Sequence, residues 1–456
     1  MKKIIYTMLI GGVLACTSAC RKYVEIPPEQ VKVLSTAADY QQLLYNSTTI
    51  DPAYYYPIFS GDDAGTNETN WQTGLNSTTA NVYTWSDKIY GSTEEDIDWQ
   101  NAYKRIFIYN TIINGVLKSS GTDQEKQLAL SSALVHRAFD YFTLVNIYAK
   151  QYDVTTAATD PGVPLLLKPE FLGDLTRASV QKVYDQIKAD LTAAIPALPD
   201  SPDFNFNPSK VSAYAVMARV LLNTREFTEA ERFANLSLAI KSTVLDLNTY
   251  KVSAATYPTR VNNPEELLMK RTSQFPVAFP ISADAESMYD KINDLRYTIY
   301  TTAGATLPNP SFIVSRGYNK SRITSDGGYL GPSVPETILI KAECEARANN
   351  IAAVLTLLND FRKKRYNNSA AYVNLTAISS DAALHLVIDE RKREFVARGF
   401  RWFDQRRLSK DVGFIATVTR VFKGITYTLE PGSNRYTYPI ADKYIALNPE
   451  ILQNPR

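Results

Sequence analysis

Apolar residues recur at helical spacing in several blocks of this chain, and these blocks alternate with long turn-rich segments. In the block from Asp96 to Leu117, Trp99, Tyr103 and Ile106 are spaced four and three apart, so they share one helix face. The block from Glu125 to Ala149 is apolar on most of its faces, which predicts a central buried helix. The pattern therefore predicts a mostly helical protein.

The same pattern predicts seven further helices. They are Thr36 to Ser47, a helix capped by Ser179 that runs to Ile195, Pro208 to Asn223, Thr228 to Ile240, Ser333 to Ala348, Ile351 to Lys364, and Ser380 to Arg398. Gly399 follows the last one, and glycine suits the left-handed C-cap that ends a helix. Residues 51–90 and 241–331 are rich in turn formers and lack a helical period, so we expect long loops with short strands, one of them at Leu267 to Lys270.

Two consecutive pairs of these helices carry small residues where the partners would cross. The alanines are Ala215, Ala218, Ala230 and Ala234 in the first pair, and Ala342, Ala346, Ala352 and Ala353 in the second. Ser333 and Glu336 are spaced as a capping box at the start of the second pair. Recurring pairs of this kind resemble tetratricopeptide packing. We therefore expect a mostly α fold, a single globular unit of tetratricopeptide-like helix pairs with long irregular loops and a few short strands.

The N-terminus has the pattern of a bacterial lipoprotein signal. Lys2 and Lys3 precede an apolar run, Ile4 to Cys16, that is shorter than the roughly 20 residues of a membrane-spanning helix. Small residues then lead directly to Cys20, whose thiol we expect to be lipidated after cleavage of residues 1–19. Two alternatives remain open: a secretory signal with incidental cysteines, and lipidation at Cys16 instead.

Charge and cysteine content narrow the function further. The chain has 49 Lys and Arg against 47 Asp and Glu, and cleavage before Cys20 would remove Lys2 and Lys3, which leaves a net charge near zero. This balance argues against nucleic acid as a partner. Only Cys344 would then remain as a free thiol, so no intrachain disulfide is expected. Tyrosine is abundant at 29 residues, and its flat ring and hydroxyl suit wet recognition surfaces as well as helix packing.

Several strings, in order along the chain, resemble the SusD/RagB family. They are KYVEIPP from Lys22, HRAFDYFTLVNIYA (His136 to Ala149) followed by PGVPL, RASVQKVYDQIKADLTAAIPALP from Arg177, PETILIKAECEAR from Pro335, IDERKREFVARGFRWFDQRR from Ile388, and YPIADKYIALNPEILQNP from Tyr438. Together they cover essentially the whole chain. Ala149 stands where the family usually has glycine, and Ala441 stands where proline is common.

The resemblance implies a function that helix periodicity does not show. Members of the family are lipoproteins of the Gram-negative outer-membrane surface that bind glycans or, in some cases, peptides. They cover the mouth of a SusC-like TonB-dependent transporter and are not enzymes. The expected function is therefore capture of oligosaccharides for such a transporter, with peptide binding, or a helical scaffold without a ligand, as alternatives. The expected localisation is the outer membrane, by a lipid anchor on Cys20.

The resemblance also organises the chain into segments. We expect a signal peptide at residues 1–19, a lipidated tether at 20–35 and an N-terminal helical region at 36–240 that contains the loop insertion 51–90. A loop-rich insertion on the ligand side, 241–332, and a C-terminal helical region, 333–456, complete the chain.

An enzyme is the less favoured interpretation of the residues themselves. His136 and His385 lie far apart in predicted helices, and the sequence contains neither a Gly-x-Ser-x-Gly motif nor a phosphate-binding glycine loop. The acidic run Glu94 to Asp96 fits the first turn of the helix that follows. Asp62 and Asp63 would serve a glycosidase only as two carboxylates placed across a cleft. We therefore expect no catalytic residue, no cofactor and no metal site.

Two further groups of residues have a predicted structural role. The basic residues between Arg391 and Arg407 alternate with acidic ones, which favours an ion-paired network over a polyanion site. Phe395, Trp402 and Phe403 are expected in the C-terminal helical core, and Trp99 and Tyr103 in the N-terminal one.

Two loop regions combine aromatic rings with polar groups, as carbohydrate recognition requires. The candidates are Asp63, Asn67, Trp71, Asn81, Tyr83 and Trp85 in the first region, and Tyr297, Arg316, Tyr318, Asn319 and Tyr329 in the second. Aromatic faces can stack on the apolar faces of sugar rings while amides and carboxylates bind the hydroxyls. The same rings would alternatively form the hydrophobic underside of the loops or contact the transporter.

Overall fold

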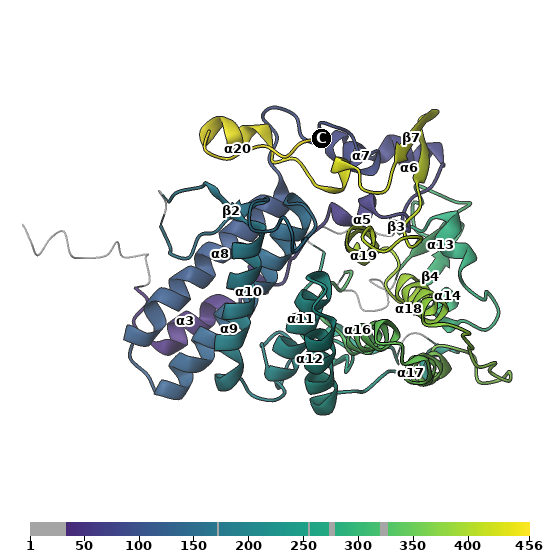
Figure 1. The fold of residues 1–456 in the computed structure, drawn as a ribbon, viewed down its shortest axis with the longest axis horizontal. Helices are drawn as coiled ribbons and strands as arrows, with labels where there is room; N and C mark the ends of the chain where they lie inside the picture. The colour runs from purple at the N-terminus through teal and green to yellow at the C-terminus, as the bar shows by residue number, and fades with distance from the viewer. Residues whose placement is uncertain (1–32, 171–172, 254–255, 273–278, 320–326) are drawn as a thin grey trace, which may run out of the picture.

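Helices make up most of the regular structure in the computed structural model, which describes residues 33–170, 173–253, 256–272, 279–319 and 327–456 (Figure 1). In these residues the α-helices are α3 (Ala37–Leu44), α4 (Ser47–Ile50), α5 (Pro57–Ser60), α6 (Thr69–Gly74), α7 (Ser77–Tyr83), α8 (Ile97–Gly115), α9 (Asp123–Tyr148), α10 (Val180–Ala194), α11 (Lys210–Asn223), α12 (Phe227–Ile240), α13 (Ala283–Ser287), α14 (Leu295–Ile299), α16 (Val334–Arg347), α17 (Ile351–Lys363), α18 (Ser380–Glu394), α19 (Phe400–Leu408) and α20 (Asp442–Leu447). The mostly α fold predicted from the sequence is confirmed.

Strands and 3-10 helices are short. The strands are β1 (Pro161–Pro164), β2 (Arg177–Ser179), β3 (Phe279–Pro280), β4 (Thr301–Ala303), β5 (Arg316–Tyr318), β6 (Val418–Phe422) and β7 (Ile425–Leu429), and the 3-10 helices are η1 (Val116–Lys118), η2 (Ile195–Ala197), η3 (Leu247–Tyr250), η5 (Arg260–Asn262), η6 (Gly304–Thr306) and η7 (Asn434–Tyr436). The strands pair antiparallel as β1–β2, as β3–β5–β4 with β5 in the centre, and as the hairpin β6–β7.

Helix α9 is the centre of the N-terminal half. A capping box between Thr122 and Glu125 begins it, and from Ser131 to Tyr148 every residue is buried, as the apolar pattern predicted. It packs between α8 and α10 (Figure 1). Because all its faces are covered, it also brings polar side chains into the core.

Two buried ion pairs fasten α9 to its neighbours. Arg105 of α8 lies 2.7 Å from Asp140, and Arg137 lies 2.7 Å from Asp190 of α10. Loss of one partner of such a pair leaves an uncompensated buried charge and costs about 3–5 kcal/mol. These three helices are therefore held together by specific polar contacts in addition to apolar packing.

The predicted helix pairs are present and lie side by side (Figure 1). Helix α11 packs against α12, α12 against α16, and α16 against α17. The alanines of α11, α12 and α16 are buried as expected, which lets the helices approach closely. In α17 the prediction was wrong: Ala352 is exposed and Ala353 half-buried, and Val354 and Leu358 make the buried contact instead.

The helix predicted from Ser380 to Arg398 ends earlier, at Glu394. Ala397 has a positive φ of 55°, which an α-helix does not allow. Gly399 is left-handed, at φ 75°, but it precedes α19 as its N-cap and is not the C-cap of α18. A Cβ at this position would lie 2.8 Å from a ring carbon of Tyr54, so the close approach of two segments also requires glycine.

Two loop predictions also differ from the structure. Residues 51–90 contain the short helices α5, α6 and α7 and no β-strand longer than a single bridge. Leu267 to Lys270 is buried, but it bends at Leu268 and only isolated bridges flank it, at Glu266 and Arg271, so it is not a strand. The hairpin β6–β7 was not predicted.

The predicted aromatic core and ion-paired network are confirmed. Trp402 is 0% exposed, and Phe403 and Tyr103 are half-buried against the same cluster, whereas Phe395, 2% exposed, lies in a second cluster with Phe400 and Leu408. Most basic residues between Arg391 and Arg407 pair with acids: Arg391 with Asp404 at 3.2 Å, Arg401 with Asp62 at 2.8 Å, and Arg407 with Glu343 at 2.6 Å. Arg398 and Arg406 are exceptions and donate to backbone carbonyl oxygens instead.

Across the described part of the chain, every helix falls short of the length and apolarity needed to cross a membrane. Cys20, the predicted lipidation site, lies outside the described residues.

Candidate functional site

The aromatic residues of the first predicted loop region are buried. Trp71 and Tyr83 pack edge to face with ring centroids 5.0 Å apart, and Trp85 is only 2% exposed. The indole nitrogen of Trp85 donates to the carbonyl oxygen of Ser60 at 3.0 Å. These three rings present no free face, so the stacking role predicted for them is corrected to a role in the core beneath the loops.

Arg420 of strand β6 covers the rings of Tyr83 and Trp85 and so accounts for their burial. Its guanidinium lies 4.1 Å from the ring centre of Tyr83 and 4.3 Å from that of Trp85. It also donates hydrogen bonds to the carbonyl oxygens of Phe59 at 2.7 Å and Tyr83 at 2.6 Å, and to that of Gly61. The hairpin thus covers the loop from outside, and no local pattern in residues 51–90 indicates this.

Asp63 is also unavailable to a ligand. Its side chain is 0% exposed and accepts a hydrogen bond from the backbone N–H of Ala397 at 2.7 Å. Burial, and then the neighbouring charge of Asp62, raise the pKa of Asp63 to about 6. The carboxyl group therefore acts as a structural link between two segments.

Two tyrosines of the second loop region are core residues as well. Tyr318 and Tyr329 are each 3% exposed. The hydroxyl of Tyr329 accepts from the backbone N–H of Leu267 at 3.1 Å and donates to the carbonyl oxygen of Leu268 at 2.9 Å. Tyr329 therefore holds the buried segment at 267–270 in place.

Asn67, Tyr297 and Arg316 are predicted contacts that the structure leaves at least partly accessible. Asn67 is exposed, and the other two are half-buried. The guanidinium of Arg316 lies 4.0 Å from the ring centre of Tyr297, while the hydroxyl of Tyr297 donates to Glu286 at 3.1 Å. One face of this ring is thus already occupied by a cation.

Glu68 joins the two predicted loop regions. Its carboxylate accepts hydrogen bonds from the backbone N–H groups of Ile313, Val314 and Ser315 at 2.6, 3.0 and 2.9 Å. Burial opposes the charge, but these donors outweigh it and lower the pKa of Glu68 to about 2. The structure therefore brings the two regions together on one side of the molecule, which we call the loop face: residues 62–90, 279–319 and the hairpin β6–β7.

A groove elsewhere offers aromatic faces that the loop face lacks. It has a volume of about 860 Å³ and lies between the C-terminal end of α3, helix α4, the segment before α11, and residues 260–271. Its lining residues are Leu44, Tyr45, Ser47, Asp51, Asp203, Phe204, Phe206, Asn207, Arg260, Val261, Met269 and Arg271. We call this the aromatic groove.

Three rings line the aromatic groove. Phe204 and Phe206 stack with ring centroids 5.4 Å apart and planes within 5°, and Tyr45 meets Phe206 edge to face at 6.1 Å. Tyr45 is 45% exposed and Phe204 47%. Exposed rings held against one another in this way form a preorganised stacking surface.

Asn205 sets the direction of these rings. Its side-chain nitrogen donates to the backbone carbonyl oxygen of Arg260 at 2.6 Å, and the backbone carbonyl oxygen of Asn205 accepts from the backbone N–H of Met269 at 2.7 Å. Because Asn205 is buried and turned inward, Phe204 and Phe206 on either side of it lie along the groove. The ligand contacts predicted from the sequence did not include Phe204 and Phe206. The alternation of Phe and Asn in this turn-rich linker between two helices was the sequence signal that could have indicated them.

Polar groups accompany the rings. Asp51 and Asp203 supply carboxylates, Asn207 an amide, and Arg260 and Arg271 guanidinium groups. Burial raises the pKa of Asp51, although the nearby positive charges of Lys270 and Arg271 oppose the shift. Rings next to hydroxyl-binding amides, carboxylates and guanidinium groups form the combination that binds sugars. Among the residues that the structure describes, no cluster of His, Cys, Asp or Glu is suited to hold a metal ion.

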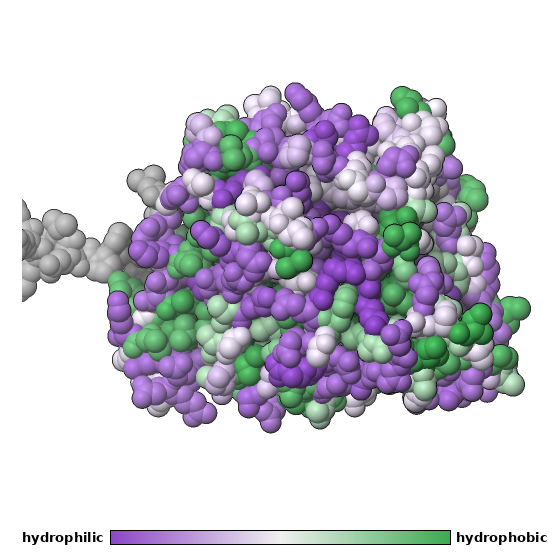
Figure 2. Space-filling view, in the orientation of Figure 1, coloured by the Kyte–Doolittle hydropathy of each residue, from purple (hydrophilic) through white to green (hydrophobic). Residues whose placement is uncertain are grey.

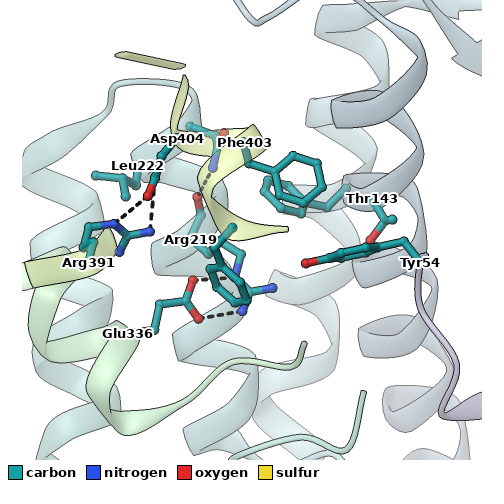
Figure 3. Close-up of a pocket in the computed structure, with 11 residues that line it drawn as sticks. Tyr54, Thr143, Arg219, Leu222, Glu336, Arg391, Phe403 and Asp404 are labelled. Carbon is teal, nitrogen blue, oxygen red and sulfur yellow. Dashed lines mark hydrogen bonds and ion pairs between the residues drawn. The ribbon is translucent and has the colours of Figure 1, made fainter. Parts of the chain in front are cut away.

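An interior pocket of about 20 Å³ has a different character (Figure 3). Arg219 donates to Glu336 at 2.7 Å, and Arg391 pairs with Asp404 at 3.2 Å, so the charges around it are neutralised. Its volume suits about one water molecule. We therefore interpret these side chains as a polar joint between α11, α16, α18 and α19.

One face of the molecule has a mostly hydrophilic centre (Figure 2). Figure 2 shows hydrophilic residues gathered near the middle of one face, with hydrophobic residues in small scattered groups. On that face the described residues form no broad apolar patch of the kind that marks a large permanent interface.

Comparisons with known proteins place the chain among related sequences and folds. The family described as "Starch-binding associating with outer membrane" matches residues 22–222, and the family described as "SusD family" matches residues 334–456. "SusD-like protein P38" from Formosa agariphila is 24% identical over 434 aligned positions, which cover 80% of each chain.

Solved structures show the same fold at low identity. A SusD superfamily protein from Bacteroides thetaiotaomicron has a TM-score of 0.74 at 19% identity, covering 92% of this chain and 100% of that one. A SusD-like carbohydrate binding protein from Bacteroides vulgatus has a TM-score of 0.66 at 19% identity, covering 92% of this chain and 98% of that one.

Proposed function

This chain belongs to the SusD family, and from that premise we propose that it captures oligosaccharides in the aromatic groove at the outer-membrane surface. SusD-like proteins bind carbohydrate and are associated with the outer membrane. The groove carries the proposal because it combines exposed rings, carboxylates and guanidinium groups within about 860 Å³. A volume in this range accommodates a ligand of several sugar rings.

The exposed faces of Tyr45 and Phe204 are the proposed stacking surfaces. Asn207, Asp51 and Asp203 would bind ring hydroxyls, and the half-buried Arg271 would act as a donor to them. The function is binding without catalysis. A peptide is the alternative ligand, since the same charged groups can pair with its termini and backbone.

Delivery and anchoring complete the proposal. A lipid on Cys20 would hold the protein at the membrane, and a SusC-like TonB-dependent transporter would receive the ligand. Within the loop face, Asn67, Tyr297 and Arg316 are accessible enough to contact ligand or transporter, and we propose this secondary role for them.

Calorimetry against neutral oligosaccharides and peptides tests the proposal. We expect saturable binding of an oligosaccharide, and we expect Phe204→Ala to weaken it about twofold to tenfold, the value of one stacking contact. Phe414→Ala is the matched control, because Phe414 also stacks on a neighbour, His385, but does not line the groove. Unchanged affinity in both Tyr45→Ala and Phe204→Ala would exclude the groove, and saturable binding of peptides alone would favour the alternative ligand.

A further inference from the structure

The hairpin β6–β7 has one protected edge and one open edge. It lies at the margin of the molecule beside α6 (Figure 1). Its turn residues, Lys423 and Gly424, both have positive φ, at 50° and 79°, as a two-residue hairpin turn requires. The flanking residues Phe422 and Ile425 therefore form a hydrogen-bonded pair, and from there hydrogen-bonded and non-hydrogen-bonded pairs alternate along the ladder. This alternation decides which backbone groups point away from the hairpin.

Gln72 of α6 protects the outer edge of β6. Val421 is next to the closing pair and belongs to a non-hydrogen-bonded pair, so its backbone N–H and C=O point away from β7. The side-chain nitrogen of Gln72 donates to the carbonyl oxygen of Val421 at 2.8 Å, in agreement with this direction. The side-chain oxygen of Gln72 accepts from the backbone N–H of Lys423 at 2.6 Å. The fold thus covers one edge of the hairpin.

The outer edge of β7 is open in the part of the chain that the structure describes. Thr426 lies opposite Val421, and Thr428 lies two residues further along the strand. The backbone N–H and C=O groups of both threonines therefore point away from β6. Within the described residues, neither threonine makes a backbone hydrogen bond outside the hairpin, and both are exposed. An edge of this kind offers donors and acceptors to another strand.

The sequence of β7 lacks the features that usually guard an edge strand. Natural proteins protect such edges with lysine, proline or a bulge. Residues Ile425 to Leu429 include no charge and no proline, and their register with β6 is continuous. Most of them are β-branched or aromatic, and Ile425 is 58% exposed. This composition suits a strand that pairs on both sides.

Single charges of opposite sign stand at the two ends of β7. Lys423 lies in the turn before the strand, Glu430 directly follows the strand, and both are exposed. The ammonium of Lys423 lies over the ring of Phe422, and the carboxylate of Glu430 accepts from the hydroxyl of Thr417. Neither charge has an ion pair within the described residues. A strand that fits this edge therefore brings a carboxylate to Lys423 and a cation to Glu430.

We propose that β7 pairs with β7 of a second copy of this chain, antiparallel about a two-fold axis at Tyr427. In the register that uses both outward residues, Thr426 lies opposite Thr428 of the second copy. Each of the two resulting pairs exchanges two backbone hydrogen bonds, and threonine beside threonine is a favourable cross-strand pair. The two hairpins then form one four-stranded antiparallel sheet.

The charges at the ends of the strand favour this partner. Two residues beyond Thr426, Gly424 faces Glu430 of the second copy, so Lys423 lies beside that carboxylate. The two-fold axis repeats the contact at the other end of the strand. A parallel arrangement would instead place like charges together. Strand β7 is therefore complementary to itself in backbone groups, side chains and charge.

The proposed dimer is weak and reversible. One strand edge offers less contact area than the roughly 1,200–2,000 Å² that a stable protein interface buries. We therefore expect a dissociation constant on the order of 1 mM. Covalent trapping measures such an association, and its register, better than equilibrium sedimentation does.

Disulfide trapping in the mature chain tests the register. The background is Cys20→Ala, since Cys344 is buried. Thr426→Cys and Thr428→Cys proteins, mixed under mild oxidation, should cross-link severalfold faster than either protein alone. Opposite positions lie about 5.5 Å apart between Cα atoms, within reach of a disulfide, whereas each position lies about 7–8 Å from its own counterpart. Equal rates in the mixture and in the single variants would overturn the proposal.

Absence of cross-linking in the mixture would overturn the proposal as well, and would leave the open edge to a strand from another protein. Both threonine side chains are exposed, so the melting temperatures of the two cysteine variants should match that of the Cys20→Ala protein. This measurement separates a failure to pair from a failure to fold.

Charge variants test the identity of the partner. In the cysteine proteins, Lys423→Glu places two carboxylates together at each end of the paired strands and should slow trapping severalfold. The double variant Lys423→Glu/Glu430→Lys restores opposite charges and should recover the parent rate, and added salt should reduce both effects. Glu170→Lys, an exposed substitution elsewhere, is the matched control. A trapping rate that does not respond to these charges would contradict the arrangement.

The strand edge and the aromatic groove are tested independently. Phe204→Ala, which tests the groove, should leave the trapping rate unchanged. Lys423→Glu should leave oligosaccharide affinity unchanged, because Lys423 does not line the groove. Failure of the proposed function and failure of the proposed pairing are therefore distinguishable.

Discussion

The carboxylate of Asp63 accepts a hydrogen bond from the backbone N–H of Ala397 at 2.7 Å, across 334 residues of sequence. Ala397 has a positive φ of 55° in the turn between α18 and α19. A non-glycine residue in this region requires support from its surroundings. The bond therefore links the loop face to the turn that ends α18.

The pKa of Asp63 predicts a specific pH dependence. Burial, and then the charge of Asp62, raise this pKa from 3.8 to about 6. Between these values the folded state binds more protons than the unfolded state, so the stability due to this group is present below pH 3.8 and is lost as the pH rises to about 6. Asp63→Asn keeps an acceptor for Ala397 without a charge.

Denaturant titrations of both proteins from pH 3.5 to 7.5 measure this effect. The unfolding free energy of Asp63→Asn, relative to wild type, should increase across about pH 4 to 6 and stay level above. A difference in unfolding free energy between the two proteins that does not vary with pH would contradict this inference. It would show that Asp63 does not take up a proton when the chain folds.

Trp85→Ala should destabilise the protein strongly. Its ring is 2% exposed and lies under the guanidinium of Arg420, and its indole N–H donates to the carbonyl oxygen of Ser60. Truncation of a buried tryptophan to alanine costs about 3–5 kcal/mol. Guanidinium titration measures the loss, with the partly exposed Tyr427→Ala as control. Near wild-type stability accompanied by lost oligosaccharide binding would instead support a ligand contact at Trp85.

Glu68→Gln should release the segment at 313–315 from the loop face. The backbone N–H groups of Val314, Ile313 and Ser315 outweigh the effect of burial and lower the pKa of Glu68 to about 2. The stabilisation is therefore present above the ordinary pKa of 4.5 and is lost as the pH falls through about 2.

Amide hydrogen exchange at pH 7 reports this release directly. Residues 313–315 should exchange faster in Glu68→Gln than in wild type, whereas helices α8 to α10 should be unaffected. The exposed Glu170→Gln is a suitable control for the loss of one surface charge. Equal protection of residues 313–315 in wild type and Glu68→Gln would show that the backbone of this segment is held by other contacts.

Cys20→Ala should free the protein from the membrane. A lipid anchor with two or more acyl chains binds stably, and none of the helices in the described residues is long and apolar enough to span the membrane in its place. Fractionation of cells and mass spectrometry of the mature N-terminus measure both consequences. An N-terminus at Cys16 would move the anchor to the alternative site.

The sequence alone was sufficient for the helical framework. Apolar spacing located α8 to α12 and α16 to α17, and Ser179 and Ser333 cap helices as predicted. Alternation of basic and acidic residues near Arg391 likewise predicted the ion pairs. Helix geometry and capping depend on residues three or four positions apart, so a local pattern determines them.

Only the tertiary structure decided which aromatic rings are accessible. Trp71 and Trp85 lie in turn-rich sequence, as Phe204 does, yet the first two are buried and Phe204 is about half exposed. Arg420, more than three hundred residues away, covers Trp85, whereas Asn205 turns inward and leaves its neighbours exposed. Side-chain exposure in a loop depends on which distant segments pack over it. Contacts of that range arise from the whole fold, and a local sequence pattern does not contain them.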